Sequence, residues 1–341
     1  MNKFSVIEVN DASWSSFVNR CFQFDFYHTQ SYNLLEANRP ILCVGTFGED
    51  FIALPLILRE IPDSDLFDCT SAYGYCGPIS NLDFNDISTE NIEAFKHELV
   101  LFFKENNIVS SFSRLHPLIS SGTFFNNFGE VVNLNKTVAI DLRIPEDEQK
   151  KQFRKSNKSE LNQLRRKGYE VVEATTDEEI DRFIEIYYET MTRVNASDSY
   201  FFSRQYFHEF LKNKCFQNKL LIAKKDNLIA AGAIFTITGK IMQYHLAGTT
   251  EMYIKETPMK LILDEARLLG NGLGLEFLHL GGGVGGSDED SLFKFKSGFS
   301  DTRFTFSIWK YIVDQEIYNE LVRKQKDLKD IKENFFPLYR G

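Results

Sequence analysis

The stretch Leu275 to Phe299, LEFLHLGGGVGGSDEDSLFKFKSGF, is conformationally the most unusual part of the chain. A strand-like apolar segment leads into five glycines within residues 281–286, the glycine loop, and then into acidic residues and a Phe-Lys-Phe-Lys sequence. Because glycine reaches backbone conformations that other residues avoid, the loop predicts positive φ angles or a close approach of the backbone to another group. That group is a ligand or another strand.

The glycine loop formally contains a G-x-G-x-x-G pattern at Gly281, Gly283 and Gly286. A dinucleotide site also needs a long helix that begins at the loop and an acidic residue about 20 positions further on. The loop is followed at once by the acidic residues 288–290, which would repel a pyrophosphate. The pattern is therefore weak evidence for a Rossmann site, and a P-loop is excluded because no Gly-Lys-Ser/Thr follows.

The loop also has a structural interpretation. Glycines let two strands separate or let a loop pass under a bound chain, while Asp288 to Asp290 cap a short helix that carries the Phe-Lys-Phe-Lys sequence. Lys294 and Lys296 lie two positions apart, so they cannot share a helix face. We expect one of them to point to solvent and the other toward whatever the loop encloses.

Composition indicates a soluble globular protein. The chain has 341 residues, 43% of them hydrophobic and 26% charged, which is long enough for two domains that each bury a core. Residues 1–149 carry 9 Lys and Arg against 21 Asp and Glu, a net charge of −12, whereas residues 150–341 carry 30 against 27, a net charge of +3. We expect an anionic partner to meet the second half.

The cysteines and the N-terminus both favour the cytoplasm. Five cysteines, without C-x-x-C spacing, indicate neither a zinc site nor a disulfide framework, so we expect reduced and mostly buried thiols. The first residues, MNKFSVIEVNDASW, lack the apolar run of a signal peptide, and no stretch approaches the roughly 20 apolar residues of a membrane helix. We expect a cytoplasmic protein without a transmembrane segment.

Strand-like and helix-like segments alternate along the chain, which predicts an α/β or α+β class. Pro55 would mark an edge or a bulge in one of the strands. We place a domain boundary at Pro145, which gives domains 1–144 and 145–341. Strands are expected at 41–47, 51–58, 108–115, 137–142, 220–224, 229–238, 240–248 and 302–313, and helices at 90–106, 145–167, 177–194, 257–269 and from residue 315.

The expected helix 145–167 is basic. Pro145 suits a first helical position, the acidic residues 146–148 complement the helix dipole, and Gly168 ends the helix. Its charges form a solvated surface, or they bind phosphate groups of RNA, of a nucleotide or of a lipid-linked precursor. The basic residues are Lys150, Lys151, Arg154, Lys155, Lys158, Arg165, Arg166 and Lys167.

The six histidines carry no recognisable catalytic or metal pattern. There is no H-E-x-x-H spacing and no Gly-x-Ser-x-Gly elbow, so neither a zinc protease nor a serine hydrolase is indicated. His279 lies in the strand that leads into the glycine loop. A core histidine with satisfied hydrogen bonds is favoured there over a catalytic one.

These motifs together resemble the FemAB-like branch, the peptidoglycan bridge-forming type, of the GNAT acyltransferase superfamily. The resemblance rests on Leu278 to Gly283, followed by Asp290 to Phe299, and on the strand 137–142 with its basic helix. The Ala247-Gly248-Thr249 strand leading to Pro258 and its helix adds to it. In the N-terminal half, residues 27–29 (YHT), 71–78 (SAYGYCGP) and 112–117 (FSRLHP) are similar to motifs of a subgroup associated with surface-polysaccharide gene clusters.

The resemblance implies two tandem GNAT-like domains, each with a mixed central sheet flanked by helices. It implies an acyltransferase that moves an acyl or aminoacyl group from acyl-CoA or aminoacyl-tRNA onto an amine of a cell-envelope precursor. That precursor is an amino sugar or a peptidoglycan peptide, linked to a lipid or a nucleotide. Neither DNA nor a metal is implied, and the protein would work in the cytoplasm or at the inner membrane face.

The chain departs from the family pattern in two places. The acyl-CoA signature should fall near residues 249–258, but TTEMYIKETP has no glycine. The long helical-hairpin arm of some family members is also missing. These departures leave open an alternative function, in which the protein is a non-catalytic binding or scaffold module of envelope or polysaccharide biosynthesis.

The resemblance also implies site residues. The family's Phe-Lys pair falls on Phe295 and Lys296, which we predict to be catalytic. Lys296 would supply positive charge near a developing oxyanion or hold an acceptor phosphate. Asp198 and His28 are candidates for a base. The predicted substrate-binding residues are Tyr73, Tyr75, Arg114, His28, Asp198, Gly281, Gly282, Gly283 and Lys294.

Overall fold

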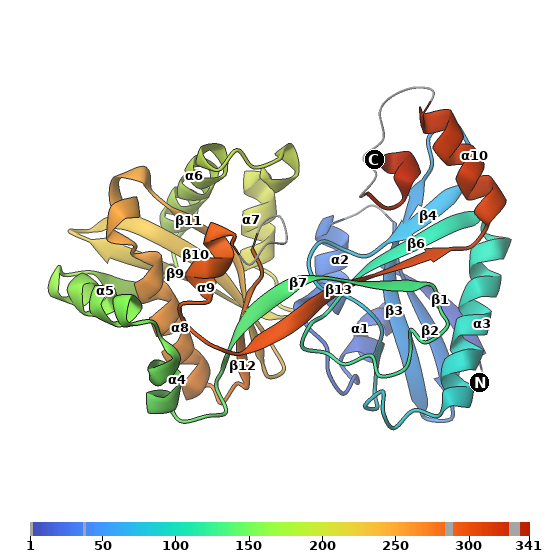
Figure 1. Cartoon of the computed structure of the whole chain (residues 1–341), viewed down its shortest axis with the longest axis horizontal. Coiled ribbons are helices and arrows are strands. Elements are labelled where there is room, and N and C mark those ends of the chain that lie inside the picture. The colour runs from blue at the N-terminus through green and yellow to red at the C-terminus, as the bar shows by residue number, and fades with distance from the viewer. Residues whose placement is uncertain (1–2, 37–38, 284–288, 327–334) are drawn as a thin grey trace. The chain divides into compact units, whose positions relative to one another are not determined.

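The structure is a computed structural model that describes residues 3–36, 39–283, 289–326 and 335–341 (Figure 1). Gly286 and Asp288, which we expected in the glycine pattern and the helix cap, lie outside the described residues. The chain forms two compact units, the first made of Met1–Leu134 and Thr305–Gly341 and the second of Asn135–Phe304. This division differs from the predicted boundary at residues 144 and 145, because the end of the chain returns to the first unit.

The first unit is a mixed sheet with the strand order β1-β2-β3-β4-β6-β13. Neighbouring strands are antiparallel except β4 and β6, which are parallel. The strands are β1 (Lys3–Glu8), β2 (Pro40–Phe47), β3 (Asp50–Glu60), β4 (Phe67–Thr70), β6 (Ile108–Leu115) and β13 (Arg303–Ile312), and β5 (Ile79–Ser80) pairs with β3. The helices are α1 (Ser13–Val18), η1 (Phe26–His28), α2 (Gln30–Glu36), α3 (Thr89–Glu105), α10 (Gln315–Lys326) and η4 (Leu338–Arg340).

The predicted β2–β3 hairpin and the predicted helix and strand at α3 and β6 are confirmed. Pro55 lies inside β3 opposite Leu42, between the segment of β3 that pairs with β5 and the segment that pairs with β4. Proline has no N–H to donate, so it fits a position between two partner strands. The core of this unit packs α3 against the sheet through residues such as Phe95, Leu99 and Phe103.

The second unit repeats this arrangement, with the strand order β7-β12-β11-β10-β9-β8. Again one internal pair, β11 and β12, is parallel and the other neighbours are antiparallel. The strands are β7 (Glu130–Asp141), β8 (Glu170–Glu173), β9 (Gln217–Lys225), β10 (Leu228–Thr238), β11 (Ile241–Thr249) and β12 (Phe277–Gly281). The helices are α4 (Glu146–Gln152), α5 (Lys155–Arg166), α6 (Asp177–Arg193), η2 (Asp198–Tyr200), α7 (Arg204–Leu211), η3 (Glu251–Glu256), α8 (Met259–Gly272) and α9 (Ser291–Lys296).

The two runs β1-β2-β3-β4-β6 and β8-β9-β10-β11-β12 have the same order and the same directions of pairing. The predicted class, an α/β protein of two tandem GNAT-like units with mixed sheets and flanking helices, is confirmed. Helices cover both faces of the second sheet (Figure 1). Leu261, Ile262 and Ala266 of α8 are buried against one face, whereas Phe183 of α6 lies against Gly232 on the other.

The prediction of one basic helix over residues 145–167 is wrong, because α4 ends at Gln152 and α5 begins at Lys155. Phe153 and Arg154 have extended backbone conformations between them. Phe153 is buried and its ring meets that of Phe299 edge to face at 5.1 Å, while the N–H of Arg154 donates to the carbonyl of Gly298 at 2.9 Å. Tertiary packing therefore interrupts a sequence whose local propensity favours a continuous helix.

Candidate functional site

Lys296 lies in α9 and is buried, with 7% of its surface exposed. Its Nζ donates a hydrogen bond of 2.6 Å to the carbonyl oxygen of Gly282 and lies 5.6 Å from the centre of the Tyr244 ring. Burial lowers the pKa of Lys296 to about 7, against the opposing effect of the Asp290 charge. Near neutral pH this amine therefore exists in both charge states, which suits a group that stabilises developing negative charge or exchanges a proton.

The helix that carries Lys296 is fixed by Asp290. The side chain of Asp290 accepts a hydrogen bond of 2.8 Å from the N–H of Phe293, which caps α9. A Cβ added to Gly283 would lie 2.1 Å from Asp290 Oδ1, so a side chain at position 283 would displace the cap. Lys294, on another face of α9, is exposed and its Nζ lies 2.5 Å from a carboxylate oxygen of Glu289. The two lysines thus point in different directions, as expected.

Phe295, the other residue of the predicted catalytic pair, is half-buried and packs against Phe299 at 5.7 Å between ring centres. The turn after α9 is held from α5, because the carbonyl of Gly298 accepts hydrogen bonds from the backbone N–H of Arg154 and from Asn157 Nδ2. Phe295 therefore stabilises the position of Lys296 by packing. Its catalytic role stays a prediction.

The glycine loop begins where β11 and β12 part. These parallel strands pair over Ile241 to Gln243 and Phe277 to His279, and β12 then ends at Gly281, whose φ is +75°. The positive φ predicted for the loop is confirmed at this position, where glycine is the favoured residue. Gly281, Gly282 and Gly283 are brought together with Lys296 at this end of the sheet.

The start of α8 is the place where the acyl-CoA signature was expected. It consists of the 3-10 helix η3, Thr257 with a φ of +56°, and Pro258 as N-cap. The carboxylate of Glu160 accepts hydrogen bonds from Thr257 Oγ1 and Lys260 Nζ there, and Glu256 pairs with Lys167. Glu256 also pairs with Lys225, so these carboxylates already occupy the cations at this helix N-terminus, and a pyrophosphate would have to displace them.

Four predicted substrate-binding residues, Tyr73, Tyr75, Arg114 and His28, lie in or beside the three N-terminal motifs, which the first unit brings together. Cys76 N–H donates to Arg114 O at 2.7 Å, which joins the second motif to the third. His28 is fully buried, and burial lowers its pKa to about 4. The ring of Tyr75 lies 6.0 Å from that of His116, and Tyr73 is 38% exposed.

His116 and Asp25 form a buried pair that sequence reasoning missed. His116 Nε2 lies 3.0 Å from Asp25 Oδ2, while His116 Nδ1 accepts from the N–H of Leu118 at 3.1 Å. Because Nδ1 accepts a hydrogen bond, the ring proton is on Nε2, which donates a hydrogen bond to the Asp25 carboxylate. The sequence signal was the histidine of the FSRLHP motif, but its partner is 91 positions away.

Asp198, the other predicted base, is exposed in η2, in the connection between α6 and α7. Tyr244 was also missed, although strand alternation predicted β11. It is half-buried and its ring lies beneath the Lys296 ammonium. The roles of Asp198, Tyr73, Tyr75 and Arg114 in binding stay predictions.

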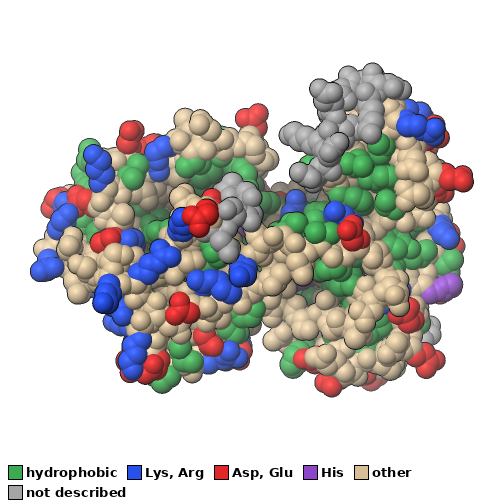
Figure 2. All heavy atoms as spheres, in the orientation of Figure 1, with side chains coloured by type: hydrophobic (Ala, Val, Ile, Leu, Met, Phe, Trp, Pro, Cys, Tyr) green, Lys and Arg blue, Asp and Glu red, His purple; other side chains and the backbone are tan. Residues whose placement is uncertain are grey.

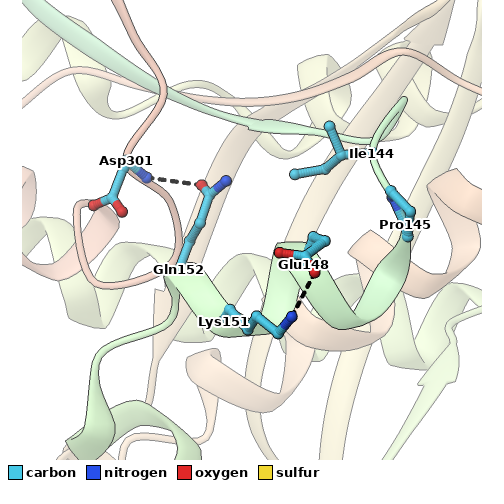
Figure 3. Close-up of a pocket in the computed structure, with 6 residues that line it drawn as sticks. All are labelled: Ile144, Pro145, Glu148, Lys151, Gln152 and Asp301. Carbon is cyan, nitrogen blue, oxygen red and sulfur yellow. Dashed lines mark hydrogen bonds and ion pairs between the residues drawn. The ribbon is translucent and has the colours of Figure 1, made fainter.

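The second unit also has an open surface hollow of about 470 Å³ beside α4 (Figure 3). Gln152 points into it and its Oε1 accepts from the N–H of Asp301 at 3.0 Å, and Glu148 pairs with Lys151 beside it. None of the predicted site residues lines this hollow. We therefore place the candidate site at Lys296 and not here.

The basic residues of α4 and α5 are exposed at the surface of the second unit (Figures 1 and 2). Some are neutralised, because Lys151 pairs with Glu148, Arg165 with Asp264 and Glu265, and Lys167 with Glu256. The interpretation of this helix pair as a phosphate-binding surface stays a prediction.

Among the described residues, no cluster of three or more His, Cys, Asp or Glu is arranged to hold a metal ion. The same part of the chain contains no helix that is long and apolar enough to cross a membrane. The five cysteines are free thiols, and three of them, Cys43, Cys69 and Cys76, are buried.

A family comparison matches part of the second unit. Residues 151–294 match the family described as Acetyltransferase (GNAT) domain; the match covers α5 to α8 and β12 and ends inside α9, before Phe295 and Lys296. The match assigns this part of the chain to the acyl-transferring enzymes, as predicted. Among curated proteins, none matches the chain in sequence.

Three solved structures show the particular kind of tandem fold. FemX superposes with a TM-score of 0.70 at 13% identity, covering 93% of this chain and 99% of that chain. L-PGS from Bacillus licheniformis has a TM-score of 0.61 at 12% identity, covering 93% and 97%. The C-terminal domain of a putative lysylphosphatidylglycerol synthetase from Agrobacterium fabrum has a TM-score of 0.57 at 13% identity, covering 89% and 91%. The predicted resemblance to the FemAB-like branch is confirmed at the level of the fold.

Proposed function

We propose that the protein transfers an aminoacyl or acyl group to an amine of a cell-envelope precursor, an amino sugar or a peptidoglycan peptide. The observation that carries this proposal is the buried Lys296 at the edge of the glycine loop, two residues after the segment 151–294 that matches a GNAT domain. The similarity of the whole fold to FemX and to lysylphosphatidylglycerol synthetases supports an envelope precursor as the acceptor.

The reaction joins the acceptor amine to the carbonyl carbon of an activated acyl group. The C–N bond forms, the ester or thioester bond breaks, and the proton lost by the amine ends on the leaving oxygen or sulfur. Lys296 as an ammonium stabilises the negative charge that develops on the carbonyl oxygen. A buried ammonium stabilises this negative charge more strongly than an exposed one, because the local dielectric constant is low.

An aminoacyl ester, such as aminoacyl-tRNA, is the donor that we favour over acyl-CoA. The start of α8 holds the carboxylates of Glu160 and Glu256, which oppose a pyrophosphate at that place. We assign no step to CoA. We infer that the acceptor approaches from the cytoplasm, or from a membrane face if it is linked to a lipid.

The test is a transfer assay that crosses two labelled donors, acetyl-CoA and aminoacyl-tRNA, with two acceptors, a nucleotide-linked amino sugar and a peptidoglycan peptide. We expect transfer from aminoacyl-tRNA, and a loss of at least about 100-fold in the Lys296→Met variant. Lys324→Met is the matched control, because Lys324 is an exposed lysine of α10 that pairs with Glu320 at 2.9 Å. Full activity of folded Lys296→Met would remove Lys296 from the mechanism, and absence of transfer from every donor would favour the non-catalytic scaffold.

A further inference from the structure

A row of buried polar side chains crosses the sheet of the second unit. Thr236 of β10 lies opposite Gln243 of β11, which lies opposite His279 of β12, and on the other side Thr236 lies opposite Asn218 of β9. Because directly opposite residues of a sheet share a face, these four side chains stand side by side. Thr236, Gln243 and His279 are each at most 1% exposed.

The face that carries this row is the one that α6 and α7 cover. Phe183 of α6 lies against Gly232, which is on the same face as Thr236, and Phe210 of α7 packs on His245 at 5.0 Å between ring centres. The opposite face holds the apolar core, which includes Ile237, the next residue of β10. A polar row under an apolar cover is unusual, because buried polar groups need hydrogen-bond partners.

Several polar atoms in and beside this row have no hydrogen-bond partner among the described residues. In the part of the chain that the structure describes, Thr236 Oγ1 and Asn218 Oδ1 are buried without a hydrogen-bond partner, and so are Thr238 Oγ1 on the same strand and Thr137 Oγ1 on β7. Thr137, two residues before the cross-strand partner of His279, is fully buried. Three such hydroxyls and one amide oxygen close together indicate ordered water or a polar ligand rather than four separate defects.

The row leads to the candidate site. Thr137 Cγ2 lies 3.8 Å from where a Cβ of Gly282 would be, and the carbonyl of Gly282 holds Lys296. His279 Nδ1 lies 2.9 Å from Gln243 Oε1, and since that oxygen only accepts, Nδ1 carries the proton. The Nε2 atom of His279 therefore has the lone pair, as a general base requires.

We propose that this polar row is a hydrated site behind the glycine loop, in which His279 acts through ordered water as the proton acceptor of the transfer reaction. As the C–N bond forms and the ester C–O bond breaks, a water molecule carries the amine proton to His279 Nε2, and the proton then returns to the leaving oxygen. Gln243 is a positioning residue, because it fixes the tautomer of His279. The catalytic part of this inference rests on the proposed function, whereas the hydration of the row does not.

Thr236→Val tests the row because valine has the shape of threonine without its hydroxyl. If the Thr236 hydroxyl of the wild type has no partner, Thr236→Val is more stable than the wild type. If that hydroxyl binds water, Thr236→Val is less stable, so the sign of the change in Tm decides. We expect a lower Tm, a rate of transfer reduced about tenfold, and recovery to within about twofold in Thr236→Ser, which keeps the hydroxyl. Ile237→Val is the matched control, because it removes a methyl group from the opposite face and should lower the Tm without changing the rate.

The tautomer is measured separately by ¹⁵N NMR of His279 in the full chain without substrate. We expect a protonated Nδ1 and an unprotonated Nε2, and loss of this signature in Gln243→Leu. A higher Tm in Thr236→Val, or a protonated Nε2 in the wild type, overturns the proposal. If no donor supports transfer, the Tm and the NMR signature still decide whether the row is hydrated, so a failure of the proposed function is distinguishable from a failure of this site.

Discussion

The Nζ of Lys296 donates to the carbonyl of Gly282 at 2.6 Å in a place where burial lowers the pKa of the amine to about 7. In an unfolded chain the same amine titrates near its ordinary value of 10.5. Between these two values the unfolded state binds a proton that the folded state does not, so stability rises as the pH rises from about 7 to 10.5. Below about pH 7 both states are protonated and the dependence ends.

Lys296→Met removes this pH-dependent contribution of the buried amine to the free energy of unfolding. We expect the variant to be more stable than the wild type at pH 7, by an amount on the order of a few kcal/mol less the lost hydrogen bond to Gly282. The difference should shrink toward pH 10. Urea unfolding at pH 7, 8.5 and 10 measures it, with Lys324→Met as the control whose curves should follow the wild type. A difference that does not change with pH would mean that Lys296 is not buried as a titrating amine.

Tyr244 tests the electrostatic environment of the same amine. Its ring lies 5.6 Å from Lys296 Nζ, and an aromatic face attracts a cation by about 1–2 kcal/mol in a desolvated site. We therefore expect Tyr244→Leu to lower the pKa of Lys296 further, because only the ammonium form loses a favourable contact. Tyr244→Phe keeps the ring and should keep the pKa.

The measurement for Tyr244 is an NMR titration of the Lys296 side chain in the three proteins. A pKa that is the same in Tyr244→Leu and in the wild type would show that the ring contributes only packing. A pKa shift of equal size in Tyr244→Phe would point to the hydroxyl instead.

Arg267 and Asp264 form a buried ion pair within α8. Both are fully buried, Arg267 Nη2 lies 2.9 Å from Asp264 Oδ1, and Arg267 Nη1 also donates to Gln149 of α4 at 3.0 Å. We expect Arg267→Ala to destabilise the protein by about 3–5 kcal/mol, because the buried carboxylate of Asp264 loses its cationic partner in α8. The double variant Asp264→Leu with Arg267→Met should recover most of that loss. Thermal or urea unfolding measures both, and equal losses in the single and double variants would contradict this account.

Much of the fold could be predicted from the sequence, because strand alternation and helical spacing are local signals. The strands β9, β10 and β11 and the helices α3 and α6 fall within a few residues of their predicted limits. The break between α4 and α5 could not be predicted, since it depends on contacts of Phe153 and Arg154 with residues near Gly298. The return of β13 to the first unit likewise depends on pairing with β6, about 200 residues earlier in the chain.

The candidate site could likewise be predicted from the sequence only in part. The glycine loop and the two lysines of α9 could be located from composition and from the rule that residues two apart on a helix diverge. Which lysine is buried could not, because the burial of Lys296 depends on Tyr244, which is 52 positions earlier, and on the path of Gly282. The polar row through Thr236, Gln243 and His279 requires the register of three strands, which the sequence does not specify.

Gly283 lies between the described start of the glycine loop and α9, and it gives the sharpest test of how α9 is held. In Gly283→Ala the new methyl group would lie 2.1 Å from Asp290 Oδ1, so the carboxylate that caps α9 must move. We expect a loss of about 1–2 kcal/mol in stability, which is the usual cost of a lost N-cap, and a lower rate of transfer because Lys296 moves with its helix. Asp290→Ser is the matched variant, since serine also caps helices, and it should keep most of the stability and the rate. If Gly283→Ala were as stable and as active as the wild type, the loop would be free to shift away from Asp290, and the cap would not be what positions Lys296.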